Sequence, residues 1–188
     1  MREPQARQDG RGSRCGRRGQ GRQDGRSSQR IQGSQRDQRN QRNQHSLRAR
    51  EFEAFVAGAG GRLLHAATLL TAEPPGAAPE AQRLLVGALA HTRADWSRLR
   101  GEDPYERTRQ ELTRRFAHTG WRHRRPRGGL LGVLPPQERL VLVLRLFEGV
   151  ADEQVAASLG LPVERVRALH TRAMATLLSR PVESAAPR

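Results

Sequence analysis

The chain has 188 residues, which is enough for one or two small domains and too few for a large enzyme with separate cofactor and substrate domains. All 34 basic residues are arginine, 19 residues are acidic, and the formal net charge of +15 predicts a polyanionic partner, nucleic acid before an acidic membrane surface. The single cysteine, Cys15, excludes an internal disulfide, and no apolar run reaches the roughly 20 residues that span a bilayer. Because no secretory signal pattern is found either, we expect a cytoplasmic protein that does not insert into membranes.

Residues 1–48 form a low-complexity segment of Arg, Gln, Gly, Ser, Asp and Asn. Large apolar side chains are almost lacking before Leu47, so the segment buries too little surface to offset the ~1–2 kcal/mol per residue that backbone ordering costs. We therefore expect a disordered N-terminal arm. Two interpretations of the arm stay open. It is either an Arg/Gly-rich RNA-binding arm or a tail without a selected function, and its lack of aromatic residues favours the tail.

Helical periodicity begins at residue 50, where apolar residues recur at spacings of three, four and seven. The pattern predicts helices over residues 50–71, 79–99 and 104–117. Their apolar stripes contain Phe52, Phe55, Val56, Leu63, Leu64, Ala67 and Leu70; then Leu84, Leu85, Ala88, Leu89, Thr92 and Trp96; and then Tyr105, Leu112 and Phe116. Together these helices predict a domain over residues 49–120, followed by a basic linker over residues 121–133.

The apolar segment 137–148 is compatible with a strand by composition alone, because it is rich in β-branched residues. It follows a Pro-Pro pair, however, and ends at Gly149, and a proline in the first turn favours a helix. Two further helices are expected at 152–159 and 163–178. No strand pattern remains, so the predicted fold is all-α.

Only three residues, Gly160-Leu161-Pro162, separate the last two helices, which is the spacing of a helix-turn-helix. Gly160 is placed to take the left-handed conformation that ends the first of them. The residues expected to face inward are Val155, Ala156 and Leu159 on the first helix and Val163, Val166, Leu169, Ala173 and Leu177 on the second. The pattern predicts a helix-turn-helix domain over residues 134–180, with a tail at 181–188.

If that stripe is buried, the exposed face of the second helix consists of Glu164, Arg165, Arg167, Ala168, Thr171 and Arg172. Arginine can donate two hydrogen bonds to a guanine edge in the major groove or neutralise phosphates. At about 100° per residue, Arg165 and Arg172 share one side of the helix and Arg167 lies toward its flank. We therefore expect Arg165 and Arg172 to face the groove and Arg167 to contact phosphate. The alternative is a solvated basic face without a ligand.

Residues 134–173 closely resemble region 4 of sigma-70-family RNA polymerase sigma factors, in the extracytoplasmic-function class and its actinobacterial form. The resemblance lies in LPPQERLVLVLRLFEGV (134–150), EQVA (153–156), LGLP (159–162) and VERVRALHTRA (163–173). Residues 51–121 are similar to region 2 of the same family through FEAFV (52–56), LLHAATLLT (63–71) and ALAHTRADW (88–96).

The resemblance implies that region 4 reads the promoter −35 element through Arg165, Arg167, Ala168, Thr171 and Arg172. It implies that the apolar helix at 140–147 helps to form the region 4 core and a surface for core RNA polymerase. Region 2 would bind the polymerase and capture the −10 element, with a flexible linker between the regions and an anti-sigma factor as a further partner. Region 2 is degenerate here, because QRLLVG (82–87) stands where an acidic stretch is usual and RQELT (109–113) where an aliphatic run followed by Asn is usual.

Catalysis has no support in the sequence. The six histidines do not share metal-ligand spacing with cysteine or acidic residues, so we expect neither a metal site nor a cofactor. We predict a sigma factor that directs promoter-specific transcription initiation and is not an enzyme. The first alternative is a stand-alone helix-turn-helix regulator or a degenerate sigma-like protein without initiation activity. The second is an RNA-binding protein that acts through the N-terminal arm.

Overall fold

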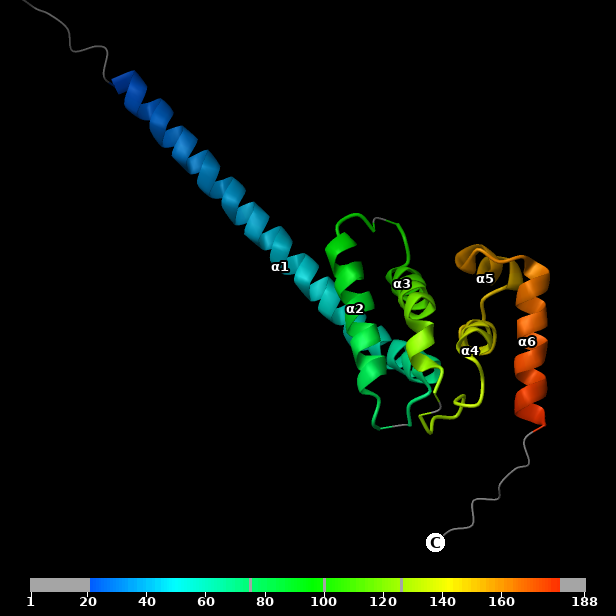
Figure 1. Cartoon of the computed structure of the whole chain (residues 1–188). Coiled ribbons are helices and arrows are strands. Elements are labelled where there is room, and N and C mark those ends of the chain that lie inside the picture. Colours follow the sequence, from blue (N-terminus) through cyan, green and yellow to red (C-terminus); the bar gives the residue numbers. More distant parts are fainter. Residues whose placement is uncertain (1–20, 75, 100, 126, 180–188) are drawn as a thin grey trace, which may run out of the picture. The chain divides into compact units, whose positions relative to one another are not determined.

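The structure, a computed structural model, describes residues 21–74, 76–99, 101–125 and 127–179 (Figure 1). Within these ranges every regular element is a helix, which confirms the predicted all-α fold. The chain divides into two units, residues 1–47 and 48–188. None of the helices in the described ranges is long and apolar enough to cross a membrane.

The described part of the first unit is helical. Helix α1 (Gly21–Thr71) begins at Gly21, not near residue 50 as predicted. Residues 21–48, for which we expected no fixed structure, therefore belong to a helix, and residues 1–20 of the predicted arm lie outside the described residues. The side chains of residues 38–47 are exposed, so this stretch of α1 is helical without burying a core. Arginine and glutamine have high intrinsic helix propensity, and no proline occurs between Gly21 and Thr71.

The second unit starts with residues 48–71 of α1, followed by α2 (Pro79–Asp95) and α3 (Pro104–Thr119). Their buried side chains include predicted stripe positions, namely Leu63, Ala67, Leu70, Leu85, Ala88, Thr92, Leu112 and Phe116. Helices α2 and α3 pack side by side (Figure 1), and a hydrogen bond of 2.9 Å joins the buried hydroxyls of Thr92 and Thr108.

The ends of these helices follow from local chemistry. The Asp103 carboxylate accepts a hydrogen bond from the backbone amide of Tyr105 (2.9 Å), and Pro104 occupies the first turn of α3. Helix α2 ends at Asp95 instead of the predicted residue 99. At this end the ring of Trp96 packs against Phe52 of α1, with ring centroids 5.2 Å apart.

In the structure, part of the predicted basic linker, residues 121–133, packs against the rest of the second unit. The first three residues of the linker belong to a 3-10 turn, η1 (Gly120–His123). Further along, the Gly129 amide donates to the carbonyl of Ala72 (3.0 Å), and a Cβ at Gly129 would lie 2.5 Å from the carbonyl carbon of Ala72. Only glycine fits this close approach. Leu131 is also buried, so this part of the linker packs against the core of the second unit.

The apolar run 137–148 forms two kinds of helical turn. Helix α4 (Pro136–Leu142) opens with the predicted proline and continues as a π-helical turn, η2 (Val143–Phe147). In η2 the backbone amide of Glu148 donates to the carbonyl of Val143 (3.0 Å), which widens the last turn. The predicted helix is therefore confirmed in place, but its C-terminal turn is not α-helical. All five residues from 140 to 144 are buried, which explains the missing amphipathic stripe.

The last two helices, α5 (Asp152–Leu159) and α6 (Val163–Leu178), have the predicted bounds. Gly160 has φ +64°, which confirms the left-handed end of α5. The residues expected to face inward are buried (Val155, Ala156, Val166, Leu169 and Ala173) or half-buried (Leu159, Val163 and Leu177). Helix α6 packs against both α4 and α5, and its opposite face is turned to solvent.

Candidate nucleic-acid interface

The candidate interface is the solvent face of α6. Because Val166, Leu169 and Ala173 pack into the core, the positions between them point outward. All six residues predicted to bind DNA are exposed: Glu164, Arg165, Arg167, Ala168, Thr171 and Arg172. The structure therefore brings the predicted set together on one helix face. Its three guanidinium groups, however, have different surroundings.

Arg165 lies in the first turn of α6. Its backbone amide donates to the carbonyl of Pro162 (3.0 Å), so the backbone at this point is fixed by the helix start. Its side chain is exposed and forms no ion pair with any residue of the described ranges. The Arg165 guanidinium is therefore open to a ligand.

Arg172 lies two turns further along the same side of α6. Its Nη1 is 3.5 Å from Oε1 of Glu138 in α4, whose side chain is only 6% exposed. The Arg172 side chain itself is 58% exposed, so one edge of its guanidinium contacts α4 and the rest faces solvent. This contact orients Arg172 without closing it to a ligand.

Arg167 is engaged by three carboxylates. Its guanidinium donates to Glu164 (2.9 Å), Asp152 (3.3 Å) and Glu153 (3.4 Å). The hydrogen bond to Asp152 and the charge of Glu164 raise the pKa of Arg167 above its ordinary value. In the protein alone, this guanidinium is thus bound to acidic side chains of α5 and α6.

Asp152, the first residue of α5, is a site residue that the sequence reasoning missed. Besides Arg167 it contacts Arg145 of η2, whose Nε lies 2.6 Å from Oδ1 of Asp152. Arg145 also donates from Nη1 to the carbonyl of Val150 (2.6 Å). The only local signal at Asp152 is an acidic residue in the first turn of a helix, which is common and indicates no partner.

Arg139 was also missed, because arginine is rarely buried. Its side chain is fully buried in α4 and donates to the carbonyls of Leu70 (2.7 Å), Leu134 (2.9 Å) and His123 (3.3 Å). Burial lowers the pKa of Arg139 to about 10. This arginine therefore serves the core of the second unit and takes no part in the exposed basic face.

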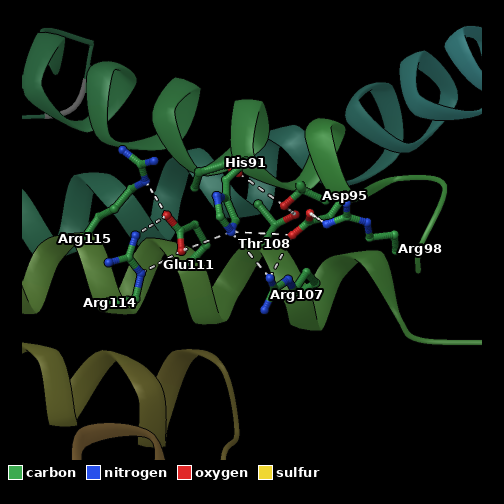
Figure 2. A network of polar contacts seen from close by, with 10 residues as sticks. His91, Asp95, Arg98, Arg107, Thr108, Glu111, Arg114 and Arg115 are labelled. Carbon is green, nitrogen blue, oxygen red and sulfur yellow. Dashed lines mark hydrogen bonds and ion pairs between the residues drawn. The ribbon is translucent and has the colours of Figure 1, made fainter.

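The arginines of α3 are largely occupied by acidic residues of the same unit (Figure 2). Glu111 accepts hydrogen bonds from Arg114 (2.8 Å) and Arg115 (2.7 Å), and Asp95 accepts one from Arg107 (2.9 Å). The bond from Arg114, helped by that from Arg115, lowers the pKa of Glu111 to about 2, and Arg107 lowers the pKa of Asp95. In the described residues no group of three or more His, Cys, Asp or Glu could hold a metal ion. Because Arg107 of α3 binds Asp95 of α2, we interpret this network as a structural link between the two helices.

Tyr105 connects α3 to the residue that follows η2. Its hydroxyl donates to the carboxylate of Glu148 (2.9 Å), whose side chain is only 1% exposed. Arg62 of α1 lies 3.9 Å from the same carboxylate and over the Tyr105 ring at 5.6 Å. Burial, together with the Glu148 carboxylate, raises the pKa of Tyr105 to about 12. The helices preceding the linker and those following it are therefore joined by a buried polar contact.

Comparison with known protein families agrees with this geometry. Residues 130–177 match the family model for Sigma-70, region 4. The matched residues contain α4, η2, α5 and nearly all of α6, including every residue of the candidate interface. The match confirms, for this segment, the predicted likeness to the sigma-70 family. A search of curated proteins finds no match to the chain.

Proposed function

We propose that this protein is a sigma-type transcription factor, which binds core RNA polymerase and directs initiation by reading a −35 promoter element with α6. One observation carries the proposal. The residues that match Sigma-70, region 4 form a helix-turn-helix whose second helix exposes Arg165 and Arg172 on one side. A helix presented in this way fits the major groove of B-DNA.

The arrangement of the exposed side chains suits base recognition. Arg165 and Arg172 are separated by about 700° of helical rotation, so both point to one side of α6. Each can donate two hydrogen bonds to O6 and N7 of guanine. Ala168 and Thr171 lie between them and are small enough to let the helix approach, with methyl groups that can contact thymine. Glu164 in the first turn can accept a hydrogen bond from the amino group of cytosine.

We further propose that the protein belongs to the extracytoplasmic-function class. The support is the two-part layout, in which helices similar to region 2 precede the helix-turn-helix within residues 48–188. The proposed partners are promoter DNA, core RNA polymerase and an anti-sigma factor. The protein would act by binding, without catalysis or a cofactor, in the cytoplasm, where its partners are found.

A stand-alone helix-turn-helix regulator, or a degenerate sigma-like protein without initiation activity, is the second candidate. The packed linker favours it. Gly129 is hydrogen-bonded to Ala72, and Arg139 to Leu70, so the segments on either side of the linker are fixed together instead of moving independently. The exposed face of α6 would still bind DNA in that case.

Two binding experiments with the full chain distinguish the candidates. The first measures capture of purified core RNA polymerase by the immobilised protein, and the second selects duplexes from a random pool. A sigma factor captures polymerase and selects a defined −35-like motif, whereas a stand-alone regulator selects a motif without capturing polymerase. Failure to select any motif contradicts both candidates.

A further inference from the structure

Asp152 lies between two arginines that come from different helical elements. Its Oδ1 is 2.6 Å from Nε of Arg145 in η2, and its Oδ2 accepts a hydrogen bond from Nε of Arg167 in α6 (3.3 Å). Asp152 itself begins α5, where a negative charge also interacts favourably with the helix dipole. One carboxylate therefore links η2, α5 and α6.

Arg167 is surrounded by more negative charge than it can neutralise. In addition to Asp152, its guanidinium contacts Glu164 (2.9 Å) and Glu153 (3.4 Å). One positive charge facing three carboxylates leaves a formal charge of −2, or −1 when Arg145 is included. A phosphate approaching this flank of α6 would meet net negative charge and donors that already have acceptors.

We propose that Asp152 is a positioning residue for α6, and that Arg167 is its partner within the protein instead of a phosphate ligand. The inference rests on the proposed DNA-binding function. The contact fixes the angle of α6 relative to α5 and η2, and thereby the approach of the groove-facing residues Arg165 and Arg172. The duplex backbone then runs along the side of α6 away from the three carboxylates. This assignment replaces the expectation that Arg167 contacts phosphate.

The two roles of Arg167 predict different effects on DNA binding when the side chain is removed. A phosphate contact contributes charge, so its loss weakens binding to every sequence and lowers the salt dependence. A positioning contact contributes geometry, so its loss weakens only the binding that depends on base edges. Stability is a poor readout for either role, because half-exposed ion pairs contribute little to it.

The test uses the full chain and two duplexes, one selected from a random pool by the wild-type protein and one scrambled sequence of the same composition. Affinity is measured over a range of salt for wild type, Asp152→Asn, Arg167→Gln and the double variant. The double variant has the net charge of wild type, and it lacks the Asp152–Arg167 contact together with the contacts of Arg167 to Glu164 and Glu153 and of Asp152 to Arg145. We expect it to lose about 3- to 30-fold in affinity for the selected duplex, with the scrambled duplex and the salt slope unchanged.

Glu153→Gln is the matched control. It removes the same charge as Asp152→Asn, one residue away, but among the described residues Glu153 pairs with Arg167 alone, at 3.4 Å, and its side chain is 67% exposed. We expect Glu153→Gln to keep the wild-type preference for the selected duplex, whereas Asp152→Asn loses part of it.

The opposite pattern would overturn the proposal. If Arg167→Gln weakens both duplexes alike and reduces the salt slope by about 0.9, and Asp152→Asn strengthens both, Arg167 is a phosphate ligand. If the wild-type protein selects no duplex that it prefers over the scrambled one, the proposed function fails together with the inference. Thermal unfolding checks each variant. Should Asp152→Asn not fold, the salt slope of Arg167→Gln alone decides between the two roles.

Discussion

The guanidinium of Arg139 donates a hydrogen bond of 2.7 Å to the backbone carbonyl of Leu70, which lies 69 positions earlier in the chain. Leu70 is in the last turn of α1, where carbonyls lack partners within the helix and the helix dipole is negative. A second bond to the carbonyl of Leu134 (2.9 Å) holds the same side chain. Backbone dipoles therefore stabilise the buried charge of Arg139 and fasten α4 to the end of α1.

Replacing Arg139 by methionine is expected to lower the free energy of unfolding by about 3 kcal/mol, because buried carbonyls lose their donors. Urea denaturation followed by circular dichroism measures the change. Arg124→Ala, at an exposed position of the linker, is the control and should stay within about 0.5 kcal/mol of wild type. Equal effects of the two substitutions would contradict the role assigned to Arg139.

Glu111 makes the stability of the second unit sensitive to acid. Its pKa is about 2 in the folded protein and 4.5 without partners, so the unfolded state binds the proton first as the pH falls. The stabilisation is fully present above pH 4.5 and is lost as the pH falls through about 2, and it amounts to roughly 3 kcal/mol. We expect wild type to lose that much more stability than Glu111→Gln between pH 5 and pH 2. Parallel pH profiles of the two proteins would exclude this account.

Tyr105 makes the stability of the second unit sensitive to alkaline pH. Its pKa rises from 10.0 to about 12 on folding, so the unfolded state loses the proton first and stability falls as the pH rises from 10 toward 12. Tyr105→Phe should lack this decrease. At pH 7 it should be less stable than wild type by about 1–3 kcal/mol, because the buried carboxylate of Glu148 loses a donor. Denaturation curves at pH 7 and pH 11 test both statements, and an unchanged stability at pH 7 would show that the contact is unimportant.

Gly160 is needed for its backbone conformation alone. Its φ is +64°, and beyond its two chain neighbours no atom of the described residues lies within 4 Å of the position that a Cβ would occupy, so crowding does not require glycine here. We expect Gly160→Val to cost about 2 kcal/mol and to weaken DNA binding, while Gly160→Asn is tolerated, because asparagine enters the left-handed region far more readily. The comparison of the two variants by thermal unfolding separates conformation from size. Equal unfolding temperatures would contradict the conformational explanation.

Sequence reasoning succeeded where short-range patterns decide the structure. The bounds of α5 and α6, the left-handed Gly160 and the exposed face of α6 all follow from spacings within about ten residues. It missed the start of α1 at Gly21, because the exposed residues 38–47 carry no apolar stripe that periodicity could detect. The contacts of the candidate site were missed for a different reason. Arg167 and Asp152 are 15 residues apart, on two helices, and no periodicity relates them.

The central claim is that α6 reads base edges. The most direct test measures the affinities of Arg165→Ala and Arg172→Ala for a selected −35-like duplex and for scrambled DNA. Each substitution should cost about 1–3 kcal/mol on the selected duplex and relax the preference at one base pair, with a much smaller loss on scrambled DNA. Arg124→Ala, an exposed arginine outside α6, should leave the ratio of the two affinities unchanged. Equal losses on both duplexes would show that α6 is only a basic surface and would contradict the proposed function.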